Sequence, residues 1–143
     1  MEQSSIRHAG FWVRVAAHVI DTIIMLMVLV PVVWWIYGAE LMASGTVRIS
    51  PLGQLGFNLG PAIVVLLFWI YRSATPGKMI LGLRIVDGRS LGKPSMPQFI
   101  GRFFAYLVSL IPLLIGFIWI AFDPRKQGWH DKIARTVVIH TRV

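Results

Sequence analysis

The stretch Phe11–Tyr37, FWVRVAAHVIDTIIMLMVLVPVVWWIY, decides the fold class of this chain. Between Asp21 and Glu40 the chain carries no charged side chain. A membrane-spanning helix needs about 20 mostly apolar residues, so the stretch predicts a first membrane segment. Aromatic residues, which favour membrane interfaces, stand at both of its ends: Phe11, Trp12, Trp34, Trp35 and Tyr37.

Two further uncharged runs follow, one between Arg48 and Arg72 and the other between Arg102 and Asp123. They predict membrane segments at about 54–71 and 96–122. Pro112 lies near the middle of the third segment, and a proline breaks or kinks a helix. Two arrangements stay open for it: one span, or a broken hairpin of about 96–111 and 113–122 that returns to its starting side.

The composition also indicates a membrane protein. The 143 residues are 56% apolar and 14% charged, against about 45–50% and 25% in soluble domains. Three apolar runs leave too little polar chain to cover them as a soluble core. With no cysteine, the chain has no disulfide scaffold and no cysteine-ligated metal site. Residues 1–143 are short enough for a single domain.

The net charge of +8 is unevenly distributed. The connection 38–53 carries one basic residue, whereas 72–102 carries six and the tail from Asp123 carries five. The positive-inside rule therefore predicts a cytoplasmic N-terminus and second connection, with 38–53 outside. No basic helix or aromatic stacking platform stands apart from the apolar runs, so we expect no nucleic-acid partner.

Two short stretches outside the apolar runs are rich in β-branched residues, Leu81–Asp87 and Thr136–Thr141. Asp87 and Gly88 form a turn-like pair directly after the first. If both lie on one side of the membrane, they can pair as a small cytoplasmic sheet. The expected fold class is an all-α membrane protein with three or four membrane helices and this small β element.

Arg14, His18 and Asp21 are spaced to share one stripe of a helix. If the bilayer begins near Phe11, Asp21 lies about 15 Å deep, where a charge needs a partner. Arg14 lies near the edge and can extend its guanidinium toward water. Two interpretations stay open: a proton or cation relay, or a buried polar contact between helices. Candidate partners for Asp21 are Asn58, Tyr106 and Ser109.

The sequence offers no pattern for enzyme chemistry. The residues from Thr75 to Lys78 lack the full pattern of a phosphate-binding loop, so we expect no nucleotide cofactor. The four histidines, at 8, 18, 130 and 140, lack metal-ligand spacing, and no G-x-S-x-G turn is present. We expect no enzyme activity, no cofactor and no metal site.

Three motifs resemble those of the RDD family of small membrane proteins, named for one Arg and two Asp. They are Ala9–Ala17 (AGFWVRVAA) followed by Ile20 and Asp21, Ser73–Asp87 (SATPGKMILGLRIVD), and Gln127–Val138 (QGWHDKIARTVV). They occur in the family's order and span nearly the whole chain. Arg135 stands where glycine is common in the family, and a tryptophan precedes His130.

The resemblance implies that the named residues are Arg14, Asp21 and, as the second aspartate, Asp131. It adds a set of motif residues: Thr75, Pro76, Gly77, Lys78, Gly82, Arg84, His130 and Asp131. It also implies a role in transport, with exchange of monovalent cations for protons suggested for some members. With Asp21 as the carrying carboxylate, we expect a homo-oligomer or a membrane-protein partner in the lipid bilayer of a bacterial plasma membrane. The rival interpretation is a non-catalytic membrane scaffold or assembly factor.

Overall fold

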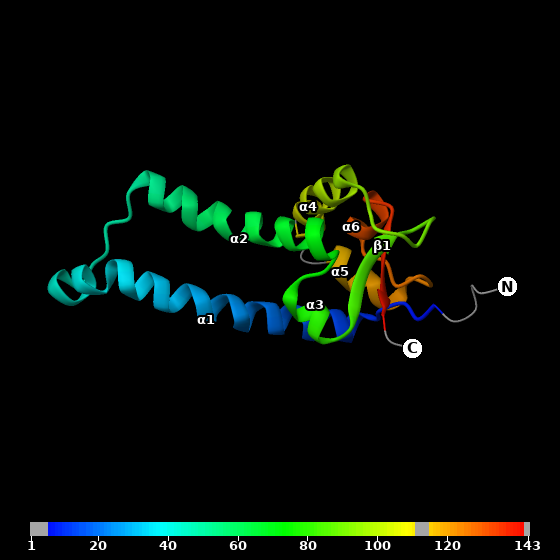
Figure 1. The fold of residues 1–143 in the computed structure, drawn as a ribbon, viewed down its shortest axis with the longest axis horizontal. Helices are drawn as coiled ribbons and strands as arrows, with labels where there is room; N and C mark the ends of the chain where they lie inside the picture. Colours follow the sequence, from blue (N-terminus) through cyan, green and yellow to red (C-terminus); the bar gives the residue numbers. More distant parts are fainter. Residues whose placement is uncertain (1–5, 111–114, 142–143) are drawn as a thin grey trace.

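The computed structural model describes residues 6–110 and 115–141 of the chain, without the side chains of 107–110. Two long helices extend from a smaller assembly of short helices and two strands (Figure 1). The elements in chain order are α1 Phe11–Ser44, α2 Pro51–Arg72, α3 Pro76–Ile80, β1 Leu83–Asp87, α4 Met96–Leu110, α5 Ile115–Phe122, α6 Trp129–Ile133 and β2 Thr136–His140.

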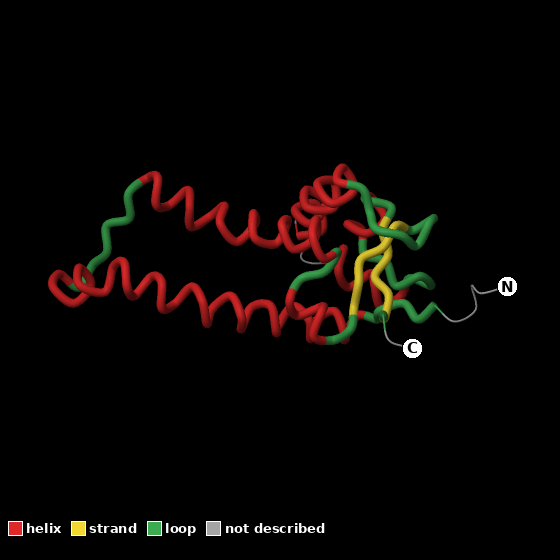
Figure 2. The backbone as a smooth tube through the Cα atoms, viewed as in Figure 1, coloured by secondary structure: helices red, strands yellow, loops and turns green. Residues whose placement is uncertain are grey.

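The helices α1 and α2 form a hairpin whose turn has clear local causes. The first ends at Gly45, whose φ of 67° suits glycine, and the amide of Gly45 bonds to the carbonyl of Leu41. The second begins after Ser50, whose side chain accepts a hydrogen bond from Gly53 N, with Pro51 in its first turn. Figure 2 shows this turn at the end of the molecule far from the strands.

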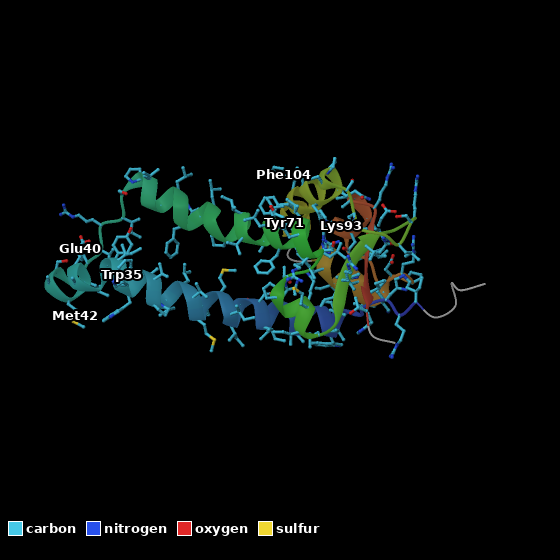
Figure 3. The ribbon with its side chains drawn as sticks, viewed as in Figure 1. Trp35, Glu40, Met42, Tyr71, Lys93 and Phe104 are labelled. Carbon is cyan, nitrogen blue, oxygen red and sulfur yellow. The ribbon has the colours of Figure 1, made fainter. Side chains whose placement is uncertain are left out.

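Among the described residues, two helical stretches are long and apolar enough to cross a membrane: α1, and the stretch Pro51–Ile80 formed by α2 and α3. Their most apolar 18-residue windows are 0% and 6% buried inside the protein. Trp35 and Met42, labelled in Figure 3, lie on α1 toward the hairpin turn and are largely exposed. The helices predicted at 11–37 and 54–71 are present, and each extends a few residues further.

The two strands pair as an antiparallel sheet, which confirms the predicted pairing of Leu81–Asp87 with Thr136–Thr141. Leu83 lies opposite His140, and Asp87 opposite Thr136. On the other edge of β2, His8 forms a bridge with Ile139. The sheet thus joins the start, the middle and the end of the chain in one place.

The third apolar segment consists of two helices, α4 and α5, that contact each other. Because β1 precedes α4 and β2 follows α5, the segment begins and ends on the same side of the molecule. At 1.5 Å per residue, the described part of this segment that forms α5 is about 12 Å long. Within the described residues, these two helices and the paired strands agree with the predicted broken hairpin. The predicted break, at Pro112, lies outside the described residues.

A small core holds the short elements together at one end of α1 and α2. Buried side chains from α2, β1, α4 and β2 meet there: Trp69, Leu83, Ile85, Phe99 and Val138. Ala17 of α1 packs against the same core. We call this end of the protein, comprising residues 6–21 and 69–141 where they are described, the head.

Candidate functional site

Asp131 lies at the centre of the head with its side chain fully buried. Arg14 Nη1 contacts Asp131 Oδ2 at 2.5 Å, and Arg102 Nη1 pairs with Oδ1 of the same carboxylate. Gly128 N donates to Oδ2 at 3.0 Å. A charge this deep is stable only when it is paired and hydrogen-bonded, and Asp131 meets both conditions.

Arg14 also connects the first helix to the end of the chain. Its Nε donates to the carbonyl of Ala9 at 3.0 Å, and its Nη2 donates to the carbonyl of Lys126 at 2.5 Å. The predicted position of Arg14 is at a membrane edge, with its guanidinium extended toward water. That placement of the side chain is wrong, because the side chain is only 4% exposed. Its planar fork of donors satisfies a carboxylate and two carbonyls inside the protein.

The ion pairs set the protonation state of Asp131. Burial raises the pKa of this carboxyl, but the guanidinium groups of Arg102 and Arg14 outweigh that effect and hold the pKa well below its usual range. Burial lowers the pKa of the neighbouring His130 to about 3. At neutral pH, Asp131 is therefore charged and His130 is neutral.

Arg102 ties α4 to the sheet and to α2. Its Nη1 donates to Thr136 Oγ1 at 2.6 Å, and its guanidinium carbon lies 5.4 Å from the centre of the Trp69 ring. The ring of Tyr106, one turn further along α4, stacks on His130 with centroids 4.1 Å apart. Four elements thus meet around one buried cation.

Asp21 is held by the start of α3. Its Oδ2 accepts a hydrogen bond from Thr75 Oγ1, and its Oδ1 accepts one from Gly77 N, both at 2.6 Å. A carboxylate at a helix N-terminus satisfies amides that have no partner within the helix. Pro76 suits the first helical position because it has no amide hydrogen to leave unpaired.

Gly77 lets α3 approach α1 closely. A Cβ on Gly77 would lie 2.2 Å from the carbonyl oxygen of Ala17 and 3.0 Å from Cγ of Asp21. Only glycine fits between the two helices at this distance. One contact with Asp21 therefore explains the order Thr-Pro-Gly. Thr75 donates a hydrogen bond to Asp21, Pro76 starts the helix α3, and Gly77 allows that helix to approach α1 closely.

The predicted stripe of Arg14, His18 and Asp21 does not form a chain of contacts in the described residues. Arg14 pairs with Asp131, Asp21 binds α3, and the ring of His18 lies edge-on to Tyr106 at 6.4 Å. Of the candidate partners for Asp21, Asn58 is exposed on α2, Tyr106 has other contacts, and the side chain of Ser109 lies outside the described residues.

The remaining motif residues have separate places. Gly82 adopts a φ of 64° in the turn before β1, which favours glycine, and Arg84 is exposed on β1. Lys78 is 1% exposed, with its Nζ 5.8 Å from the centre of the Trp69 ring. Arg135 also has a positive φ, 54°, which explains why glycine suits this position.

A cavity of about 770 Å³ lies in the head against α1. Its lining includes Arg14, His18, Lys78 and Arg102, together with apolar side chains of α1 and α5. Among the described residues, no cluster of three or more histidine and acidic side chains could hold a metal ion. The available chemistry at this site is therefore that of cations beside an apolar surface.

Sequence reasoning missed Arg102, Trp69 and Thr136 as parts of the site. Arg102 was visible only as the charge that precedes the third apolar run. A lone arginine at the start of an apolar run is more often a surface residue, so nothing in the sequence indicated that Arg102 is buried.

Comparison with known proteins agrees with these motifs. A Bacillus subtilis protein named "Uncharacterized protein YxaI" is 34% identical over 148 residues, covering 92% of this chain and 97% of that protein. The "Uncharacterized membrane protein YteJ" of the same organism is 29% identical, covering 95% of this chain and 83% of that protein. "Uncharacterized protein RP437" of Rickettsia prowazekii is 46% identical over 72 residues, which are 50% of this chain and 39% of that protein.

No solved structure matches the chain. The profile of the RDD family matches residues 8–135, which include Arg14, Asp21 and Asp131. These three residues are the ones whose contacts join α1 to α3 and to α6. The chain belongs to the RDD family and is a membrane protein of that family.

Proposed function

We propose that the chain is a non-catalytic membrane scaffold, in which a rigid head holds a membrane hairpin for assembly. The observation that carries the proposal is the engagement of Asp21, whose two oxygens each accept a short hydrogen bond from the start of α3. A carboxylate that carries ions or protons has to release its partners in each cycle. Asp21 instead supports the contact between α1 and α3.

The geometry also favours a shallower position for Asp21 than the middle of the membrane. The head packs on one side of α1 as far as Asp21, and the rest of this helix, from Thr22 to Ser44, extends beyond the head. At 1.5 Å per residue this part of α1 is about 34 Å long, enough for the hydrocarbon core of a bilayer. Asp21 would then lie at the membrane edge, where a charge is less costly.

The exposed apolar surface of α1 and α2 supports assembly with a second copy. Trp35 is 85% exposed and Met27 72%, with most of their neighbours on α1 also open. Lipid covers part of this surface, and an identical hairpin offers it a matching apolar face. We place the assembly in a bacterial plasma membrane with the head in the cytoplasm, because the head carries most of the basic residues.

One observation favours a second candidate, exchange of monovalent cations for protons. The cavity follows α1, and His18, about one turn before Asp21, lines it. In this alternative Asp21 exchanges its bonds to α3 for a proton or a cation.

Proton flux separates the two candidates. Wild type, Asp21→Asn and the control Glu40→Gln, which removes an exposed acid of the same helix, are reconstituted in vesicles with a trapped pH dye. The scaffold predicts that Na⁺ or K⁺ causes no pH change above protein-free vesicles in any of the three. A cation-dependent pH change in wild type and Glu40→Gln that Asp21→Asn abolishes would replace the scaffold with the exchanger.

Assembly is tested separately with a single cysteine in the cysteine-free chain. We expect Trp35→Cys to form a disulfide-linked dimer on oxidation in native membranes, whereas Lys93→Cys, exposed in the head, should not. A Trp35→Cys protein that stays monomeric under these conditions would contradict assembly through α1.

A further inference from the structure

The cavity beside α1 carries more positive charge than the head neutralises. The charged side chains among the described residues that line it are Arg14, Lys78 and Arg102, all cations. Behind them, Asp131 neutralises part of this charge through its pairs with both arginines. Asp21, the other nearby carboxylate, already accepts two hydrogen bonds from α3. With Lys78 protonated, three cations against two carboxylates leave one positive charge at the cavity.

Lys78 is the cation whose hydrogens are not accepted. Its side chain is 1% exposed, and Nζ has no hydrogen-bond acceptor in the described part of the chain. The Trp69 ring, 5.8 Å away, provides a cation–π contact, but a ring face does not accept three ammonium hydrogens. Arg102 has two further nitrogens, Nε and Nη2, with no hydrogen-bond acceptor among the described residues. Buried donors of this kind are normally satisfied, so their clustering indicates an anionic ligand.

The rest of the cavity is apolar. Its wall includes Val19 and Ile23 on α1 and Ile118 on α5, each about half exposed. From Arg14 to Ile23 the cavity extends about 14 Å along α1, from the cations toward the apolar half of the helix. A volume of about 770 Å³ is in the range of ligand-binding pockets. The space is too long and too apolar to be explained by a small free anion.

We propose that this cavity binds an anionic amphiphile, with its phosphate or carboxylate headgroup at Lys78 and Arg102 and its apolar tail along Val19, Ile23 and Ile118. The headgroup would supply acceptors for the buried nitrogens and cancel the excess charge. The tail would cover apolar side chains that the head leaves open. An amphiphile in this cavity is compatible with a scaffold and with an exchanger alike.

The test titrates purified protein in a neutral detergent with a short-chain phosphatidic acid and follows the bound state by native mass spectrometry. Phosphatidylcholine of the same chain length controls for the tail, and inorganic phosphate is added as a competitor. We expect one equivalent of phosphatidic acid to bind at least about tenfold more tightly than phosphatidylcholine, as a charge-assisted contact implies. Inorganic phosphate should not displace it at comparable concentration.

Two variants with the same charge change locate the site. Lys78→Met should weaken phosphatidic acid binding by about tenfold or more, whereas Lys93→Met, exposed in the head (Figure 3), should change it by less than about twofold. Lys78→Arg, which keeps the charge, should retain binding. Val19→Trp, which fills the apolar wall without touching a cation, should weaken it.

Several outcomes would overturn the proposal. Equal binding of both lipids would show that the headgroup charge is not recognised, and equal losses in Lys78→Met and Lys93→Met would place the anion elsewhere. Displacement by inorganic phosphate would show a free-anion site with no role for the tail. If Lys78→Met fails to fold, Val19→Trp still tests the site. A folded Val19→Trp protein that binds phosphatidic acid as tightly as wild type would by itself contradict the proposal.

Discussion

Gly77→Ala tests the contact between α1 and α3 most sharply. The added Cβ would lie 2.2 Å from the carbonyl oxygen of Ala17, well short of an ordinary contact at 3.4 Å. Because that atom belongs to the backbone of α1, the helix α3 has to move. Restoring an ordinary contact lengthens the bond from Gly77 N to Asp21 from 2.6 Å to about 3.8 Å, beyond hydrogen-bonding range.

The expected cost is about 2–3 kcal/mol, from overpacking and from the loss of a hydrogen bond to a charged group. In a protein of this size that corresponds to a fall of roughly 5–10 °C in the thermal midpoint, measured in detergent by circular dichroism. Gly56→Ala is the control, because nothing lies within 4 Å of a Cβ there and alanine favours the helix. If Gly77→Ala is as stable as Gly56→Ala, α3 does not pack on α1 as described.

Three further predictions concern pH, backbone strain and orientation. Burial lowers the pKa of His130 to about 3 from 6.5, so the unfolded chain binds more protons in this range, and the free energy of unfolding should fall as the pH drops through it. Chemical denaturation at several pH values should show the free energy of unfolding falling by up to about 1.4 kcal/mol per pH unit because of this group. A free energy of unfolding that does not change with pH would contradict the burial of His130. Arg135→Gly should raise the thermal midpoint by about 2–4 °C, because the left-handed backbone conformation of Arg135 costs about 1 kcal/mol, which glycine avoids. An unchanged or lower thermal midpoint would contradict this backbone strain. In intact cells, an impermeant thiol reagent should label a cysteine at Ser44 and not one at Ser90, and the reverse pattern would invert the proposed orientation.

Much of the fold could be predicted from local pattern. The charge-free runs mark α1 and α2, and the β-branched stretches mark the strands that pair. Pro112 left two arrangements open for the third apolar segment, one span or a broken hairpin. These features depend on residues close in sequence, where periodicity and turn chemistry carry the information.

The contacts of the site could not be predicted in this way. Arg14 and its partner Asp131 are 117 residues apart in the sequence. Helical periodicity places Arg14 and Asp21 on one stripe of α1, but it does not indicate which residue binds Arg14 or which binds Asp21. The family resemblance singled out both aspartates but not their contacts. Lys78 was predicted in a cytoplasmic connection, and its burial accompanies the close packing of Gly77 on α1, which the sequence did not indicate.

The central claim is that the beginning, middle and end of the chain form one head on one side of the membrane. The chain has no cysteine, so a pair can be introduced at Arg84 and Ile139, which lie opposite each other on β1 and β2. Directly opposed strand residues have Cα atoms about 5.5 Å apart at most, within the reach of a disulfide. Oxidation in native membranes, followed by non-reducing digestion and mass spectrometry, should yield the linked peptides from Arg84→Cys/Ile139→Cys and none from Arg84→Cys/Ser44→Cys. Two accessible thiols at 84 and 139 that never link would contradict the account.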